Sequence, residues 1–221
     1  MQANYVQRLR IRFSKVGPTR YIGHLDLART LERAFNRARL PIAYTQGFNK
    51  RPRMQLATAL PLGFTSDCEM VDIWLQEAVD PAAAQVQLVA RMAPGILVQE
   101  VVEVPISEPP LQTRTLDATY EVTLLQSVDD TELRRRVAAL LAAATLPRER
   151  REKEYDLRPL IYELEVMPAA DGSPRLEMRL ALQPSQTGRP DEVAQALELD
   201  PQTIRVHRTR ITLEPLSIPA S

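Results

Sequence analysis

Cysteine and glycine are scarce in this sequence, which has one cysteine, Cys68, and seven glycines among 221 residues. One cysteine excludes an internal disulfide and any zinc or iron–sulfur site built from this chain's thiolates alone. It is also typical of a reducing compartment, so we expect a cytoplasmic protein. Walker and dinucleotide-binding glycine motifs are absent. No apolar run approaches the ~18 residues of a membrane span, and the basic, polar first residues are not typical of a secretory signal.

Acidic residues are scarce in the first part of the chain, although the 28 basic and 28 acidic residues cancel overall. Residues 1–60 hold twelve basic and two acidic residues, a net charge of +10. Residues 61–133 have a net charge of −11 and residues 134–221 a net charge of +1. Basic residues at 148–158 are interrupted by glutamates, so their net field is weak. The first segment attracts a polyanion unless carboxylates of the second neutralise it within the fold.

Hydrophobic periodicity predicts one order of elements twice. In the first half, strands are expected at residues 5–13, 42–45, 70–75 and 96–106, and helices at 25–39 and 81–92, with residues 54–60 as a candidate for a further strand. The segment PISEPP, residues 105–110, is the best candidate linker. In the second half, strands are expected at 119–126, 161–166, 175–182 and 203–213, and helices at 129–144 and 190–197. Two copies of βαββαβ predict an α+β fold with two tandem ferredoxin-like units, residues 1–106 and 107–221, and antiparallel sheets.

Short polar and turn-forming residues mark the ends of two of these helices. Asp80, followed by Pro81, is an expected N-cap, and Asp129 is another. Pro94 and Gly95 are expected to end the helix that begins at Pro81.

Three arginines of the first predicted helix share one face. Arg29, Arg33 and Arg37 follow one another at i, i+4 spacing and form one stripe. Leu27 and Leu31 lie on the roughly opposite face, so packing them on a sheet turns the arginines outward. Like charges at this spacing cost a helix about 0.2–0.5 kcal/mol per pair, and a phosphate backbone would reverse the sign of that cost. The alternative is a solvated face that binds nothing.

A second basic element follows this helix, where Lys50, Arg51 and Arg53 lie beside the aromatic residues Tyr44 and Phe48. Aromatic rings stack on unpaired bases, a contact worth ~1–3 kcal/mol per base. Arginine binds phosphate through two hydrogen bonds, and the amides of this segment are suited to base edges. The alternative is that the rings pack into the domain and the cations are only solvated. The candidate RNA-binding residues are Arg29, Arg33, Arg37, Tyr44, Gln46, Phe48, Asn49, Lys50, Arg51 and Arg53.

Candidate catalytic groups are few. His24, at the start of the first helix, is a weak candidate for the general base of RNA cleavage. A histidine there also serves as a capping or packing residue. The spacing of His24, Asp26, Asp67 and Glu69 matches no known metal loop, so we predict no metal and no cofactor. The acids around Cys68 are expected to raise the pKa of its thiol, which argues against a reactive nucleophile.

Residues 21–72 contain HLDL at residues 24–27 with arginines after it, YTQGF at 44–48 and LPLGFTS at 60–66. With these motifs, the segment resembles the N-terminal signature of the radical-SAM-linked family, a family of unknown function. KEYDLRPLI at residues 153–161 resembles a second segment of that family. Two positions depart from the pattern, because Gly23 stands in place of serine and Lys50 in place of proline.

The resemblance implies an RNA-binding accessory protein. Members of that family are fused to, or encoded beside, B12-binding radical SAM proteins, often near a ribonuclease of the E/G type. Because this chain lacks a cysteine-rich cluster motif, radical chemistry belongs to a separate enzyme chain, with tRNA or rRNA as the shared substrate. A protein–protein adaptor without RNA contact is an alternative.

A second alternative is a metal-independent endoribonuclease. Tandem ferredoxin-like units with a basic first helix are also similar to CRISPR repeat-processing endoribonucleases, in which His24 would be the base. The glycine-rich C-terminal loop typical of those nucleases is absent from residues 205–221.

Overall fold

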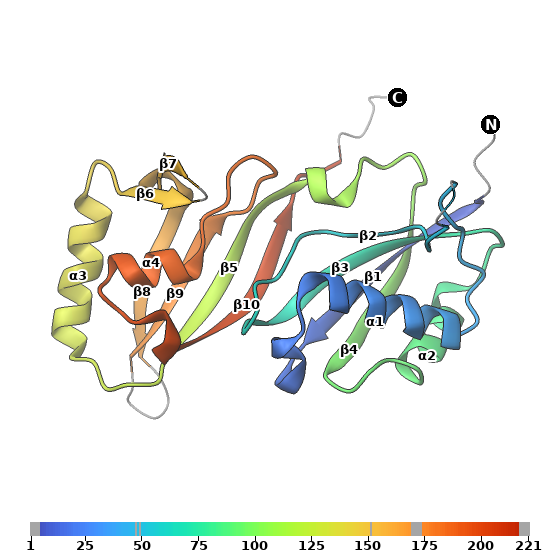
Figure 1. The fold of residues 1–221 in the computed structure, drawn as a ribbon, viewed down its shortest axis with the longest axis horizontal. Coiled ribbons are helices and arrows are strands. Elements are labelled where there is room, and N and C mark those ends of the chain that lie inside the picture. Colours follow the sequence, from blue (N-terminus) through green and yellow to red (C-terminus); the bar gives the residue numbers. More distant parts are fainter. Residues whose placement is uncertain (1–4, 47, 49, 151, 169–173, 217–221) are drawn as a thin grey trace. The chain divides into compact units, whose positions relative to one another are not determined.

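The computed structural model describes residues 5–46, 48, 50–150, 152–168 and 174–216. The chain divides into two compact units, one comprising the chain up to Thr115 with the segment from Glu214 onward, the other comprising Leu116–Leu213. The boundary expected after residue 106 lies within the first of these units. Each unit combines two α-helices with a sheet in which most strand pairs are antiparallel (Figure 1).

The first unit contains four strands and two helices among its described residues. Its elements are β1 (Gln7–Lys15), α1 (His24–Arg37), β2 (Met54–Leu56), β3 (Thr65–Leu75), α2 (Pro81–Val89) and β4 (Ile96–Val104). The strand order is β4-β1-β3-β2, and β1 pairs antiparallel with both β3 and β4. Strands β2 and β3 are also antiparallel.

Side chains alternate across β1, and this alternation gives the first unit its core. Leu9, Ile11 and Phe13 are fully buried, in one cluster with Leu31 of α1 and Leu88 of α2. Both helices therefore pack on the face of the sheet to which these β1 residues point. The arginines that alternate with them point to the opposite face.

The second unit repeats the order and adds a hairpin. Its elements are β5 (Thr115–Leu124), α3 (Asp130–Ala142), β6 (Pro147–Arg150), β7 (Lys153–Asp156), β8 (Ile161–Pro168), β9 (Pro174–Ala181), α4 (Pro190–Ala196) and β10 (Ile204–Leu213). The main strand order is β10-β5-β9-β8, which matches that of the first unit position by position. Strands β6 and β7 form a separate two-stranded sheet.

Two sequence-based expectations for the strands differ from the structure. Residues 42–45 form only isolated bridges, from Ile42 to Leu75 and from Tyr44 to Pro52. A strand requires pairing at consecutive positions, and this proline-flanked segment pairs only at single ones. The β6–β7 hairpin was not expected, since its strands consist mostly of charged residues and lack apolar alternation. The turn expected at Asp171 and Gly172 lies outside the described residues.

The two expected N-caps are confirmed, whereas α2 ends at Val89, before the stop expected at Pro94 and Gly95. The Asp80 carboxylate accepts a hydrogen bond of 2.8 Å from the Ala83 amide, and Asp129 caps α3 in the same way. Gly95, after α2, has a positive φ of 87°, and a Cβ there would lie 2.7 Å from the Val16 carbonyl oxygen. None of the helices in the described ranges combines the length and apolar character required to cross a lipid bilayer.

Candidate nucleic-acid interface

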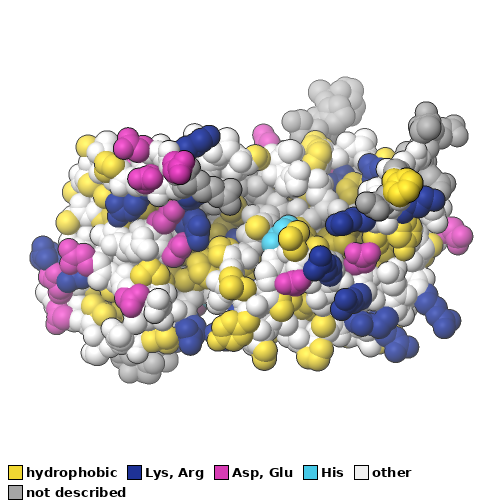
Figure 2. All heavy atoms as spheres, in the orientation of Figure 1, with side chains coloured by type: hydrophobic (Ala, Val, Ile, Leu, Met, Phe, Trp, Pro, Cys, Tyr) yellow, Lys and Arg dark blue, Asp and Glu magenta, His cyan; other side chains and the backbone are white. Residues whose placement is uncertain are grey.

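Helix α1 presents its arginines to solvent because its apolar face is used in the core. Leu27, Leu31 and Phe35 are buried, whereas the three arginines of the stripe are exposed, as the spacing predicted. Figure 2 shows Lys and Arg side chains gathered over α1 on the face drawn.

Those three arginines have weak partners or none. Arg29 Nη1 lies 3.5 Å from Asp26 Oδ1, and both side chains are largely exposed. Arg37 Nη2 donates to the Arg91 carbonyl oxygen at 2.9 Å, a contact that leaves its charge uncompensated. Within the described part of the chain, Arg33 forms no ion pair. An exposed ion pair such as that of Arg29 contributes at most about 1 kcal/mol, so the stripe keeps its field.

The basic segment after α1 is closed at its base like a hairpin. The Thr45 amide donates to the Arg51 carbonyl at 2.8 Å, and the Arg51 amide donates to Thr45 Oγ1 at 3.1 Å. Phe48 is 106% exposed, so its ring does not pack into the domain. Tyr44 is partly exposed, and Gln46, Lys50, Arg51 and Arg53 are exposed. Asn49 lies outside the described residues.

One contact joins this segment to α1. Tyr44 donates its phenolic hydrogen to Asn36 Oδ1 at 3.4 Å, and Asn36 lies next to Arg37 on α1. The structure therefore brings the C-terminal end of α1 beside the base of the segment. We call the six cations Arg29, Arg33, Arg37, Lys50, Arg51 and Arg53 the basic face.

The arginines of β1 are treated differently by the fold. Arg8 donates to Asp72 through Nε at 2.9 Å and Nη2 at 2.5 Å, and both side chains are almost fully buried. Arg10 binds the other oxygen of Asp72 at 2.9 Å and Glu108 at 2.7 Å. Arg12 lies 3.6 Å from Glu100 in an exposed pair. Carboxylates of the acidic middle segment thus neutralise β1, whereas among the described residues the basic face has only the weak, exposed pair of Arg29 with Asp26.

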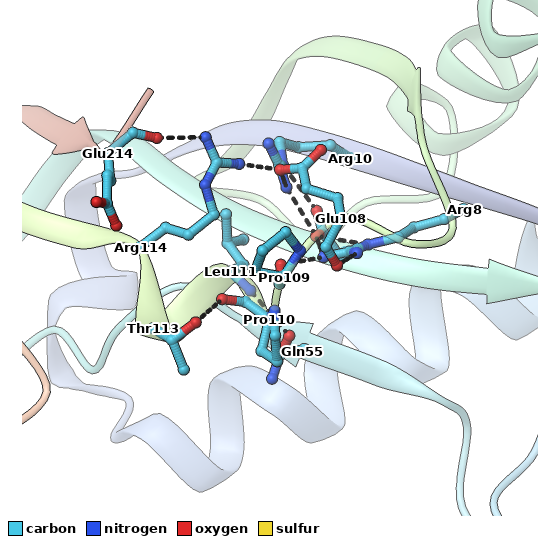
Figure 3. Close-up of polar contacts among 11 residues, drawn as sticks. Arg8, Arg10, Gln55, Glu108, Pro109, Pro110, Leu111, Thr113, Arg114 and Glu214 are labelled. Carbon is cyan, nitrogen blue, oxygen red and sulfur yellow. Dashed lines mark hydrogen bonds and ion pairs between the residues drawn. The ribbon is translucent and has the colours of Figure 1, made fainter. Parts of the chain in front are cut away.

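The segment expected to be a linker takes part in this buried network (Figure 3). Glu108 is buried and receives hydrogen bonds from Arg10 and Arg114. Arg114 also donates to the Glu214 carbonyl at 2.6 Å. Burial by itself lowers the pKa of Arg10, but the hydrogen bonds and charges of Asp72 and Glu108 outweigh it and raise that pKa above its ordinary value. Residues 105–114 are therefore a packed part of the first unit.

Two aromatic side chains that contact the basic face, Tyr5 and Trp74, were not expected from the sequence. The Arg53 guanidinium carbon lies 4.6 Å from the Tyr5 ring centroid and 5.2 Å from that of Trp74. The two rings are 6.4 Å apart in an edge-to-face arrangement. Tyr5 and Trp74 are far from Arg53 in sequence, so only the strand register could have indicated this contact.

The family model described as an uncharacterized protein conserved in bacteria, DUF2344, matches residues 8–190. The chain belongs to this family. No curated protein matches the sequence at a significant level. The matched range of the DUF2344 chain includes α1, the basic segment after it and the hairpin of the second unit.

His24 stands on the same helix of the DUF2344 chain as the arginine stripe. It is the first residue of α1 and is exposed. Among the residues the structure describes, no three His, Cys, Asp or Glu side chains gather in a way that could hold a metal ion.

Two of the basic residues at 148–158, Arg150 and Arg158, form contacts within the second unit. Arg150 pairs with Glu192 at 2.5 Å and lies over the Tyr155 ring. Burial and a hydrogen bond to Glu192 raise the pKa of Tyr155 to about 12. Arg158 donates to the Leu141 carbonyl at the end of α3. Arg150 therefore holds the hairpin in place, and Arg158 holds the segment that follows it.

Proposed function

We propose that this DUF2344 protein is an RNA-binding accessory protein of the cytoplasm. It works with a separate radical SAM enzyme in the modification or processing of tRNA or rRNA. We further propose that its two units are tandem ferredoxin-like folds, because both have the element order βαββαβ and the same strand order.

The observation that carries the RNA-binding proposal is the unequal pairing of cations in residues 1–60. Arg8 and Arg10 are held by Asp72 and Glu108, whereas no described carboxylate pairs strongly with the basic face. Unpaired like charges at i, i+4 spacing cost stability, so a ligand that supplies negative charge explains why they stand together. A phosphate backbone supplies such charge at regular intervals.

The exposed aromatic side chains favour RNA over an acidic protein as this ligand. Phe48 is fully exposed beside Lys50 and Arg51, and Tyr44 is partly exposed at the base of the same segment. Large apolar rings are seldom left in water without a use, and stacking on unpaired bases is the use that suits a surrounding of cations. The proposed ligand is therefore a single-stranded region of RNA.

The radical SAM partner rests on the sequence resemblance and on the lack of cluster ligands in this chain. An iron–sulfur cluster requires several cysteine thiolates, and the only cysteine, Cys68, is buried. The accessory protein would bind the RNA, and the partner enzyme would supply the radical chemistry.

Replacing Arg29, Arg33 and Arg37 together by glutamine tests the proposal. We expect the affinity for a dye-labelled single-stranded RNA, measured by fluorescence anisotropy, to fall by about tenfold or more. The matched control replaces Arg134, Arg135 and Arg136 of α3 by glutamine, which removes the same charge from arginines that already pair with Asp130 and Glu132. The proposal fails if both variants bind RNA as the wild-type protein does.

The position of His24 on the stripe-bearing helix favours endoribonuclease activity as a second candidate function. The protein is incubated with the same labelled RNA in EDTA, and the RNA is then analysed on a denaturing gel to distinguish the two functions. Intact RNA indicates binding alone, whereas cleavage that disappears in His24→Ala indicates a nuclease. A protein that binds no RNA but still captures its enzyme partner after nuclease treatment would instead be a protein–protein adaptor.

A further inference from the structure

We propose that Arg53, held in cation–π contact with Tyr5 and Trp74, is a preorganised site for one backbone phosphate of the bound strand. The inference rests on the proposed RNA-binding function and adds a specific ligand group to it. Its basis is that the Arg53 guanidinium lies within cation–π distance of both rings, at 4.6 and 5.2 Å from their centroids.

The backbone of Arg53 is fixed on both sides. Its amide donates to the Ala43 carbonyl at 2.7 Å, and its carbonyl accepts from the Trp74 amide at 3.1 Å. Neither Lys50 nor Arg51 has an aromatic ring contact among the described residues. Before any ligand binds, the position of Arg53 is therefore more restricted than that of Lys50 or Arg51, the two other cations of its segment.

A second guanidinium near Trp74, that of Arg8, differs from that of Arg53 because its charge is paired with a carboxylate. Arg8 lies 4.8 Å from the Trp74 centroid, but its N–H groups donate to Asp72 and to the carbonyl oxygen of Glu108. No described carboxylate pairs with Arg53, and its side chain donates no hydrogen bond within the described ranges. One cation beside this tryptophan is thus neutralised, and the other keeps its charge.

A cation–π contact restrains a guanidinium without using its N–H groups as hydrogen-bond donors. The edge of the Arg53 guanidinium therefore remains able to donate two parallel hydrogen bonds to the oxygens of one phosphate. Because its position is already restricted, less side-chain entropy is lost on binding than at a freely rotating arginine or lysine. A phosphodiester fits this chemistry, and the nearby exposed Phe48 would stack on a base of the same strand.

The sequence supplies its own probe, since Trp74 is the only tryptophan in the chain. We would titrate the full chain with a dye-labelled single-stranded RNA of about 16 nucleotides and follow anisotropy and tryptophan emission in parallel. The wild-type protein is expected to change its tryptophan emission as RNA binds. Arg53→Gln should lose most of that change and bind about tenfold more weakly. Arg53→Lys, which keeps the charge without the planar fork, should recover only part of the affinity.

Arg205→Gln is the control, because Arg205 is an exposed arginine with no ion pair among the described residues. It should leave both signals at wild-type values. RNA binding that depends on the α1 arginines but is unchanged in Arg53→Gln, with constant tryptophan emission, overturns this inference and leaves the proposed function standing. A wild-type chain that binds no RNA overturns both.

Discussion

At the scale of single residues, neighbouring arginines have opposite roles because strand geometry sorts them. Arg8 and Arg10 of β1 lie on the same face of the sheet as Asp72 of β3, and the register places Arg10 directly opposite Asp72. Burial of a guanidinium is costly unless a carboxylate and hydrogen bonds compensate it. The fold satisfies that condition for Arg8, which is 1% exposed. These two arginines are therefore used for stability and are not free to bind a ligand.

We predict that Asp72→Asn lowers the free energy of unfolding by about 3–5 kcal/mol, because it leaves the buried Arg8 charge without its partner. Urea unfolding followed by circular dichroism would measure the change. The control is Asp26→Asn, which breaks only the exposed pair with Arg29 and should cost less than about 1 kcal/mol. A loss of similar size in both variants would contradict the role assigned to Asp72.

At this scale, the sequence predicted charge and exposure on α1 but not pairing on β1. Helical spacing alone places the stripe opposite Leu27 and Leu31, and the structure confirms it. The partners of Arg8 and Arg10 depend on strand register and on the path of residues 105–114, which brings Glu108 back to β1. Neither is encoded in local spacing. The stacking of Arg53 was missed for the same reason.

At the scale of elements, side-chain capping by aspartate marks where α2 and α3 begin. α3 starts at an aspartate cap, and Glu132 in its first turn forms ion pairs with Arg135 at 2.7 Å and Arg136 at 2.8 Å. A negative charge there also suits the positive end of the helix dipole. Hydrogen bonds from Arg135 and Arg136 lower the pKa of Glu132 from 4.5 to about 2.

This pKa shift predicts how α3 contributes to stability across pH. A lowered pKa in the folded protein means that the stabilisation is present above pH 4.5 and is lost as pH falls toward about 2. Glu132→Gln should therefore destabilise the protein at neutral pH, and the difference from wild type should shrink across that interval. Urea midpoints at neutral and acidic pH would measure it. A difference that is constant with pH would contradict the assigned pairing.

Elements with apolar periodicity could be predicted from the sequence, and elements without it could not. α1, β1 and β5 carry apolar residues at regular spacing, so their type was predicted and their bounds agree within a few residues. The β6–β7 hairpin places Glu149 opposite Glu154 and Arg150 opposite Lys153, a pattern that no hydrophobic rule detects. It is held by longer-range contacts such as that of Arg150 with Glu192.

At the scale of the whole molecule, net charge gives little information about binding. The chain has no net charge, and the first unit as divided by the fold holds 14 basic and 11 acidic residues, a net charge of only +3. The excess of the first sixty residues is largely offset once acids up to residue 115 are included. Under the proposed function, attraction to a polyanion must therefore come from the local basic face.

This origin predicts the salt dependence of RNA binding. Each phosphate neutralised on a single strand contributes about −0.7 to the slope of log K against log salt, so contact by all six cations of the basic face gives a slope of about −4. Anisotropy titrations over a series of chloride concentrations would measure it. Removing the three α1 arginines should reduce the slope to about −2, while the α3 control should leave it unchanged. A slope near zero would mean that these cations do not contact phosphates, and a slope much steeper than −4 would place further contacts outside the basic face.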